Sequence, residues 1–499
     1  MKMKFNFIIL LTALIMLTAC SNKSEDNIIL MPVKNDPTVS IKIWFKVGSQ
    51  NDPEGKEGLA SLTAAMLSDG ATINNSYEDI LEKLFPLASG YNCNSSTEMT
   101  IYSGRTHVDN IDEYYPLFVD GFLNPAFEET DFNRLKDETL NYLKTNLKYS
   151  SDEELGKAVL YNEIFEGTPY GHISPGTISA LESITLEDVK SFYNQYYTRS
   201  NFVLGVAGGY EESLVDKLLE DLSKLSENKP AEIAKPNFTP IEGHQVAIVE
   251  KNAPATAISM GFPIQILRGS KDWYALAIAN SWFGEHRNSS SHLYQVIREA
   301  RGLNYGDYSY IENFPNGGSR QMPPTNVSRR QQIFEIWIRP VPNETKHFSL
   351  RAALRELKLL VDEGLTQSEF ELTRNFLKKY VLHYAPTTSE RLGYALDDKF
   401  YGIEGSHLEK FRKMMDEMTL EDVNNAVKKY LQYDNIQIAI ITNNADEFKN
   451  ALVNNTSSPI EYSSPKPQSV LDEDVQIINY QLPIKEENVK IIQLEDLFL

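Results

Sequence analysis

Residues 184–189, Ile-Thr-Leu-Glu-Asp-Val, give the clearest information about architecture, because residues 418–423 repeat them as Met-Thr-Leu-Glu-Asp-Val. In both copies a threonine stands where it can cap a helix whose first turn carries two acids. At the same spacing after each threonine, Asn201 and Asn435 open short apolar runs typical of strands. A shared capping motif, spacing and following strand predict that the chain contains two copies of one α/β unit.

Outward from the two copies, the chain divides into two repeats and a tail. We expect a first repeat at residues 35–225 and a second at residues 244–455. Residues 226–243 combine prolines with charged and polar residues, which predicts a linker. After it the second repeat runs into a tail, residues 456–499, in which residues 489–494 could pair as an edge strand.

Each repeat opens with strand-like sequence and continues into amphipathic helices. Residues 39–47 open the first repeat, and residues 245–250 and 257–262 open the second. Apolar residues then recur at spacings of three and four, as in residues 354–361. Strands followed by helices, without a repeated Rossmann-like glycine loop, predict an α+β fold in which helices pack on one face of each sheet.

The N-terminus has the pattern of an exported protein. Two lysines precede an apolar run at residues 5–17, which is short for a membrane span and suits a signal-peptide core. Residues 17–20, Leu-Thr-Ala-Cys, resemble a bacterial lipobox, in which Cys20 takes the lipid. We therefore predict a lipoprotein signal peptide at residues 1–20; the alternative is a chance cysteine after an ordinary signal peptide.

The residues after Cys20 bear on location. Ser21 is not the aspartate that often retains lipoproteins at the inner membrane, so we expect a lipid-anchored protein of the bacterial cell envelope, at the outer membrane. Residues 21–34 are predicted to be a tether. With Cys20 lipidated, Cys93 is alone, so no intrachain disulfide can form and core packing must stabilise the fold.

The charge balance argues against one class of partner. The 499 residues include 48 Lys and Arg against 69 Asp and Glu, a net charge of −21. Such a surface repels phosphate backbones, so nucleic acid is not an expected partner. The plainer interpretation of the charge is a solvated surface.

Residues 58–67, Gly-Leu-Ala-Ser-Leu-Thr-Ala-Ala-Met-Leu, predict a helix with two different faces. Leucines and a methionine share one face, which should belong to the core. The other face carries only small residues, which are Ser61, Ala64 and Ala65.

Several motifs around this helix resemble the insulinase/pitrilysin family of zinc peptidases. They are Met-Leu-Ser-Asp-Gly-Ala-Thr at residues 66–72, Asn-Pro-Ala-Phe at 124–127, and Thr-Pro-Tyr-Gly at 168–171 with a later Gly176. The resemblance covers roughly residues 35 to 450 and includes the two-repeat plan. It implies a mainly antiparallel sheet in each repeat and a clam-like half-chamber.

Active members of that family carry His-x-x-Glu-His on this helix, two zinc ligands and a general base. Here the corresponding residues are Ser61, Ala64 and Ala65. The third ligand of active members, a glutamate on a later helix, falls by counting on Asn141; a shift of one turn would bring Glu138 there. Because catalytic zinc needs about three protein ligands, the resemblance implies a non-catalytic member, with zinc expected only in a partner subunit.

A relocated metal site is the first alternative. Glu285, His286 and His292 form the only local cluster of this kind in the sequence, in a predicted loop. Loop histidines are usually not ligands, but metal bound there would favour an active peptidase with a relocated metal site.

The second repeat keeps a segment that matches the family's Arg-x-x-Arg-Gly-Leu-x-Tyr pattern, at residues 298–305. In active relatives such an arginine and tyrosine position the peptide backbone, so the resemblance implies substrate binding by Arg298 and Tyr305. The other interpretation is that Arg298 and Arg301 are cations at a helix end that Gly302 terminates, and it remains open.

These features together predict a non-catalytic subunit. It would pair with a zinc-bearing homologous peptidase, complete its chamber and bind extended peptide, for example by adding it to a sheet edge. The remaining alternative is a non-enzymatic peptide-binding envelope lipoprotein without a peptidase partner.

Overall fold

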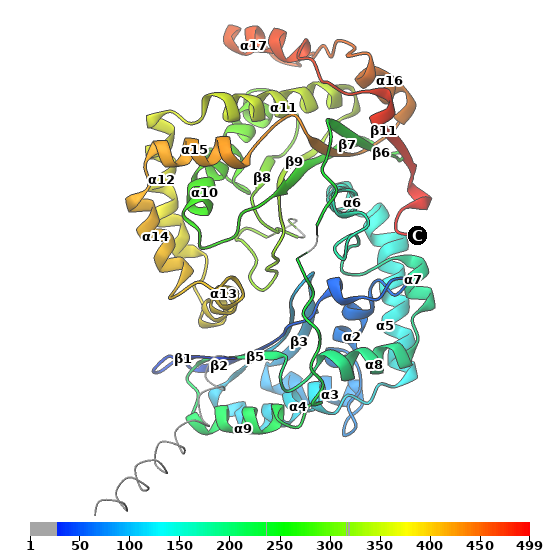
Figure 1. Ribbon diagram of the computed structural model, residues 1–499, viewed down its shortest axis with the longest axis vertical. Helices are drawn as coiled ribbons and strands as arrows, with labels where there is room; N and C mark the ends of the chain where they lie inside the picture. The colour runs from blue at the N-terminus through cyan, green and yellow to red at the C-terminus, as the bar shows by residue number, and fades with distance from the viewer. Residues whose placement is uncertain (1–26, 236, 316, 318–319) are drawn as a thin grey trace, which may run out of the picture.

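The computed structural model describes residues 27–235, 237–315, 317 and 320–499, whose strands form two sheets, built mainly from the first and the second predicted repeat (Figure 1). The first sheet has the order β1-β5-β2-β4-β3 and the second has the order β11-β6-β10-β7-β9-β8. The strands of the first sheet are β1 (Ile28–Pro32), β2 (Thr38–Phe45), β3 (Gly90–Ser95), β4 (Thr100–His107) and β5 (Phe202–Gly208). Those of the second are β6 (His244–Glu250), β7 (Ala255–Ile264), β8 (Asp307–Tyr310), β9 (Gln332–Pro342), β10 (Ile436–Thr442) and β11 (Val489–Gln493).

The two sheets repeat one plan. In the first, β5 lies between β1, which is parallel to it, and β2, which is antiparallel; β4 and β3 continue the antiparallel order. In the second, β10 lies in the same way between β6 and β7, and β9 and β8 continue. The run β6-β10-β7-β9-β8 thus reproduces β1-β5-β2-β4-β3, and the predicted duplication of a mainly antiparallel α+β unit is confirmed.

The helices follow the same division. We call the first sheet and its helices the first unit, and the second sheet and its helices the second unit. Helices of the first unit are α2 (Leu59–Ser68), α3 (Tyr77–Leu84), α4 (Ile111–Leu123), α5 (Glu129–Asn141), α6 (Asp152–Phe165), α7 (Ile178–Ser183), α8 (Leu186–Tyr196) and α9 (Glu212–Leu222). Those of the second are α10 (Lys271–Gly284), α11 (Lys346–Glu363), α12 (Gln367–Tyr380), α13 (Thr388–Tyr401), α14 (His407–Glu417), α15 (Leu420–Tyr430), α16 (Ala445–Val453) and α17 (Gln468–Ile478). Two π-helical turns are η5 (Tyr142–Leu147) and η6 (Tyr294–Glu299), and short 3₁₀ turns occur at residues 49–51, 85–87, 108–110, 343–345, 381–383, 486–488 and 494–496.

The repeated sequence motif starts equivalent helices. Thr185 Oγ1 accepts the backbone N–H of Asp188, whose carboxylate accepts the backbone N–H of Thr185 in return, so α8 begins with a capping box. Thr419 and Asp422 build the same capping box at the start of α15. Each helix then leads into an interior strand of its unit, β5 or β10.

One helix of each unit packs against the sheet of the other unit. Helix α6 packs against β7, β9 and β10 of the second sheet, and α13 packs against β1, β2 and β5 of the first. Leu396 on α13 joins Trp44, Ile101 and Val203 of the first unit in one buried apolar cluster. Helices of a unit's own chain segment cover one face of its sheet, as predicted, while the opposite face is covered in part from across the molecule.

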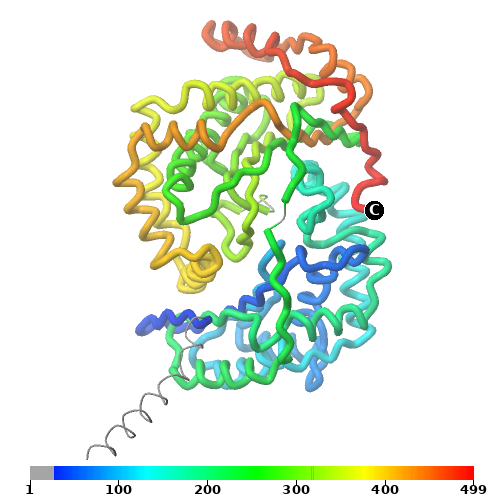
Figure 2. Tube along the Cα trace, viewed as in Figure 1, coloured from blue at the N-terminus to red at the C-terminus, as the bar shows by residue number. Residues whose placement is uncertain are grey.

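The C-terminal segment also joins the two units. β11 pairs in parallel with β6, which confirms the predicted edge strand, and α17 packs on α11. The chain then descends to the first unit (Figure 2), where Leu494, Leu497 and Phe498 belong to its core. Lys148 and the backbone N–H of Ile178 donate hydrogen bonds to carbonyl oxygens of this end segment. The predicted tail is therefore an integral part of both units.

The start of the first unit differs from the prediction. Residues 28–32, assigned to a tether at residues 21–34, form β1, which pairs with β5. The segment, Ile-Ile-Leu-Met-Pro, is short and does not alternate between apolar and polar residues, so its sequence did not indicate a strand. Its pairing depends on β5, which lies far along the chain. The described residues 227–235 and 237–242 of the linker form no helix or strand, as expected.

The predicted signal peptide and the predicted lipidation site, Cys20, lie outside the described residues. Within the described part of the chain, no helix has the length and apolar character needed to span a membrane. Cys93 is a free thiol buried in the first unit.

Candidate functional site

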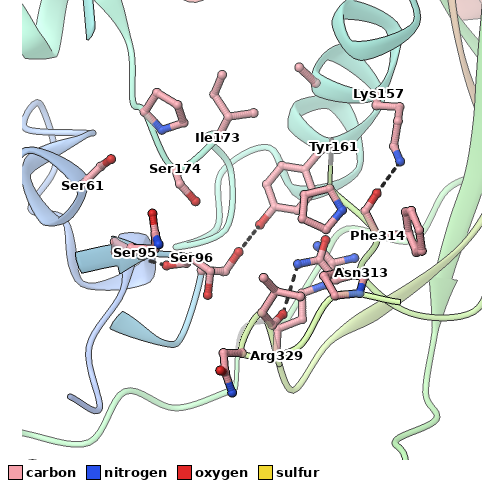
Figure 3. Close-up of a pocket in the computed structure, with 18 of the residues that line it drawn as sticks. Ser61, Ser95, Ser96, Lys157, Tyr161, Ile173, Ser174, Asn313, Phe314 and Arg329 are labelled. Carbon is pink, nitrogen blue, oxygen red and sulfur yellow. Dashed lines mark hydrogen bonds between the residues drawn. The ribbon is translucent and has the colours of Figure 1, made fainter. Parts of the chain in front are cut away.

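A cavity of about 630 Å³ lies between the two units. Its first wall comes from β3, the turn after it and helix α6, and its second wall comes from residues 313–335, which lead to and include the start of β9. Figure 3 shows Ser95 and Ser96 from the first wall across from Asn313, Phe314 and Arg329. The volume is in the range of about 300–1,000 Å³ that ligand pockets usually occupy.

Helix α2 brings one of the predicted positions to this cavity. The side chain of Asp52 holds the start of α2, because its two oxygens accept the backbone N–H groups of Gly58 and Ala60 at 2.8 and 2.7 Å. His172 Nε2 lies 3.1 Å from the same carboxylate. Burial of Asp52, opposed by these hydrogen bonds, raises the pKa of its carboxyl group above the usual value. Gly58 has φ +105°, a conformation that favours glycine, so the entry into the helix is fixed.

The four residues at the positions of the family's zinc site have different surroundings in the structure. Ser61 lines the cavity, Ala64 is fully buried and Ala65 is half-buried against the core of the first unit. Asn141 is exposed at the last residue of α5 and does not line the cavity. Glu138, the alternative third position, is also exposed and pairs with Arg134 at 3.3 Å.

These residues do not fit a zinc ion. Two alanine methyl groups offer no donor atom, and a serine hydroxyl is not among the nitrogen, thiolate and carboxylate ligands that zinc sites use. No hydrolytic step through a metal bound at α2 follows from this chain's own side chains.

The relocated site is not assembled either. His286 lies 2.7 Å from the hydroxyl of Tyr310 and 2.8 Å from the carbonyl oxygen of Arg320. His292 lies instead 2.7 Å from the carboxylate of Glu356. Burial lowers the pKa of His286 to about 4 and raises that of Glu285 to about 7. Throughout the part of the chain that the structure describes, no three His, Cys, Asp or Glu side chains group in a way that could hold a metal.

The segment with the arginine-tyrosine spacing lies at the surface, away from the cavity lining. The Tyr305 side chain is 78% exposed, and Arg298 is partly exposed beside Glu299. Gly302, with φ +75°, ends the helical turn and donates its N–H to the carbonyl oxygen of Arg298 at 2.7 Å. Substrate binding by Arg298 and Tyr305 stays a prediction, and it would require a partner's chamber to reach them.

Arg301 has a different role from Arg298. Its side chain is fully buried, with Nε 2.8 Å from Asp474 and Nη2 2.8 Å from Glu473, both on α17. Arg301 therefore fastens the C-terminal segment to the second unit.

Sequence reasoning missed the charged side chains that line the cavity. Lys157 on α6 donates to the carbonyl oxygen of Phe314 at 2.6 Å and lies over the rings of Tyr310 and Trp337, 4.7 and 4.4 Å from their centroids. Its ammonium is 4.0 Å from Glu335, a buried carboxyl group whose pKa is raised by burial. These residues come from distant parts of the chain, so no local pattern could have united them.

Two further cations that line the cavity are Lys42 and Arg329. Lys42 on β2 donates to Asn326 Oδ1 at 2.9 Å, a contact between the units. Arg329 lies with its guanidinium 5.3 Å from the ring centroid of Tyr161. The cavity thus presents cations, neutral polar groups and the carboxyl groups of Glu154 and Glu335 beside the edge strand β3, an arrangement suited to binding an extended polar chain.

Comparisons with known proteins agree with this architecture. A family model described as insulinase (peptidase family M16) matches residues 28–173, and one described as peptidase M16 inactive domain matches residues 183–377. The first match begins at β1, the strand that the sequence pattern did not predict.

Individual relatives have low sequence identity to this chain but match it over most of its length. An uncharacterized zinc protease of Rickettsia bellii is 25% identical over 389 residues, which cover 76% of this chain and 85% of that protein. The non-peptidase homolog YmxG of Helicobacter pylori is 22% identical and covers 82% and 89%. The crystal structure of a peptidase M16 inactive domain from Pseudomonas fluorescens has the same fold, with a TM-score of 0.73 at 22% identity over 84% of this chain and 97% of that one.

Proposed function

Because this chain belongs to the insulinase family of peptidases, peptidase family M16, and carries Ser61, Ala64 and Ala65 in place of His-x-x-Glu-His, we propose that it is a non-catalytic subunit. In this role it binds extended peptide and completes the chamber of a zinc-bearing homologous peptidase. The partner's zinc, not this chain, supplies the hydrolytic chemistry.

The open edge of the first sheet is the observation that carries this proposal. β3 pairs with β4 on one side only, and no described strand pairs with its other side. Asn92, Asn94 and Ser95 of β3 line the cavity, so this edge strand borders the space between the units. An extended peptide that adds to β3 would satisfy those groups, which is the mode of β-strand addition.

The lack of zinc ligands on α2 supports the proposal that a partner chain supplies the metal. An ancestral peptide-binding shell that has lost its metal ligands still offers a strand edge and a cavity, but no general base and no activated water. Turnover of a bound peptide therefore needs a second chain with an intact His-x-x-Glu-His motif. A neighbouring gene that encodes such a chain, of similar two-repeat length, would support this pairing.

The site of action in the proposal is the bacterial cell envelope. The lysines before the apolar run at residues 5–17, and the lipobox-like Leu-Thr-Ala-Cys ending at Cys20, support export and lipid anchoring, with Ser21 favouring the outer membrane. Labelling of cells with a fatty-acid probe tests this part: the wild-type chain should become labelled, and a Cys20→Ala chain should not.

A reconstitution experiment tests the proposed role. The purified chain, a zinc-bearing homologue from the same cell, and their mixture are assayed for cleavage of an internally quenched peptide. We expect cleavage by the mixture to exceed the sum of the separate activities, and to be lost when the partner's first zinc-ligand histidine is changed to alanine. Cleavage by this chain alone would overturn the proposal.

A non-enzymatic peptide-binding lipoprotein is the second candidate, because the open edge of β3 and the cavity require no partner to bind peptide. Peptide binding by the isolated chain, with no gain of activity in any mixture and no complex on size-exclusion chromatography, would favour this candidate.

A further inference from the structure

Two cations at the cavity wall have no carboxylate partner. Arg329 is only 3% exposed, and its Nε donates to the neutral side chain of Gln332 at 3.2 Å. Lys42 is half-buried, and its ammonium donates to the neutral side chain of Asn326. Among the described residues, no carboxylate oxygen lies within 4.0 Å of either cationic group. Burial lowers the pKa of Lys42, although the charges of Asp397 and Glu390, which lie beyond ion-pair distance, oppose this shift.

The other well-buried arginines of the molecule show what is unusual here. Arg268 pairs with Glu312 at 2.7 Å, and Arg301 pairs with Asp474 at 2.8 Å. A charged side chain is rarely buried without such a partner, because removing it from water is costly. Arg351 is the other fully buried arginine without a carboxylate, but it bonds Ser458 and the carbonyl oxygen of Ile478 and does not line the cavity.

On the basis of the peptide-binding role proposed above, we infer that the cavity selects acidic peptides, whose carboxylates pair with Arg329 and Lys42. Arg329 presents a rigid fork of N–H donors that suits a carboxylate, while its other face lies against Tyr161. Lys42 supplies a second positive charge from β2. Both residues line the same cavity as the open edge of β3, so a strand added there would have its side chains within the field of these cations.

The charge of the lining is opposite in sign to that of the whole chain. The molecule carries −21, yet the cations Lys42, Lys157, Arg320 and Arg329 line the cavity against the carboxylates Glu154 and Glu335. A cleft with one predominant charge focuses its field on an incoming ligand. The exterior would repel an acidic peptide, so the preference must come from contacts inside the cavity, which makes it testable by single substitutions.

The test uses labelled peptides of equal length and the purified chain, read by fluorescence anisotropy at low ionic strength. One peptide contains glutamates, the second has glutamine at the same positions, and the third has lysine there. We expect the glutamate peptide to bind about tenfold more tightly than the glutamine peptide, and the lysine peptide to bind most weakly.

Variants locate the effect. Arg329→Gln and Lys42→Gln should each reduce the preference for the glutamate peptide over the glutamine peptide. Lys413→Gln, on the exposed surface of α14, is the matched control and should change nothing. If Arg329→Gln fails to fold by circular dichroism, Lys42→Gln alone carries the test.

The outcomes separate this inference from the function on which it rests. Equal binding of all three peptides, tighter binding of the lysine peptide, or an unchanged preference in both variants would overturn the acidic selectivity and leave peptide binding intact. Absence of binding by every peptide would overturn both.

Discussion

Arg330 of the second unit and Glu98 of the first are joined by two hydrogen bonds of 2.6 Å, one from Nε and one from the backbone N–H of Arg330. The hydroxyl of Tyr170 also donates to this carboxylate, whose side chain is only 3% exposed. The neighbours of this pair in the sequence, Thr97 and Arg329, line the cavity. The ion pair therefore holds the two walls together beside the cavity.

The substitution Glu98→Gln should weaken the contact between Glu98 and Arg330 that joins the two units. An amide has one acceptor oxygen for the four donors that now meet the carboxylate, from Arg330, Tyr170 and Gln50, so its NH₂ group would face a donor. We expect the free energy of unfolding, measured by urea titration, to fall by about 1–3 kcal/mol. Glu227→Gln, at the exposed pair with Arg199, is the matched control and should cost less than about 1 kcal/mol. Equal effects of the two substitutions would contradict the structural role of Glu98.

Arg298→Ala and Arg301→Ala should differ in their effect on the free energy of unfolding, although the two residues lie close together in the sequence. Arg301→Ala leaves Asp474 buried without its guanidinium partner, and we expect a loss of about 3 kcal/mol or more in unfolding free energy. Arg298→Ala removes only a partly exposed side chain, so stability should change by less than about 1 kcal/mol.

Activity distinguishes the two interpretations of Arg298. In the reconstituted mixture, Arg298→Ala should lower peptide turnover while the chain stays folded. If it lowers only the melting temperature and leaves turnover unchanged, Arg298 is a helix-end cation and has no part in substrate binding.

Asp307 predicts a pH dependence with a defined sign. Its carboxyl group is fully buried at the start of β8, and burial raises its pKa to about 8, although Asn304 donates a hydrogen bond to it at 2.7 Å. The group stays protonated in the folded chain at a pH where the unfolded chain is ionised. Its contribution to stability is therefore complete below about pH 4 and is lost as the pH rises to about 8.

Asp307→Asn removes that titration. Relative to wild type, the variant should gain stability as the pH rises from 4 to 8, by at most about 1.4 kcal/mol for each pH unit. Urea titrations of both proteins at pH 5 and pH 8 measure the difference. A stability difference that is the same at both pH values would show that Asp307 is ionised in the folded chain.

The duplication could be predicted from sequence because it rests on local chemistry. Thr185 and Thr419 cap equivalent helices, and a capping box is visible within four residues. β1 was missed because Ile28–Pro32 becomes a strand only through its long-range pairing with β5. The crossing of α6 and α13 to the opposite sheets was also invisible, since periodicity shows which face of a helix is apolar but not which sheet it covers.

For the candidate site, the sequence showed which zinc ligands are missing but not which charged side chains line the cavity. The missing ligands at Ser61, Ala64 and Ala65 follow from one motif on one helix. Lys42, Lys157 and Arg329 are separated by more than a hundred residues from one another, and an isolated cation looks like any surface charge until the fold buries it.

The most direct test of a subunit without its own metal is the zinc content of the purified chain. The protein is expressed from Asn22 onward, dialysed against zinc-free buffer and analysed by mass spectrometry of the metal, with a zinc-bearing homologue treated in parallel as the positive control. We predict zinc no higher than in the buffer blank, because Ser61, Ala64, Ala65 and Asn141 do not provide a zinc-binding set. Near-stoichiometric zinc would contradict the account and direct the search to His286 and His292.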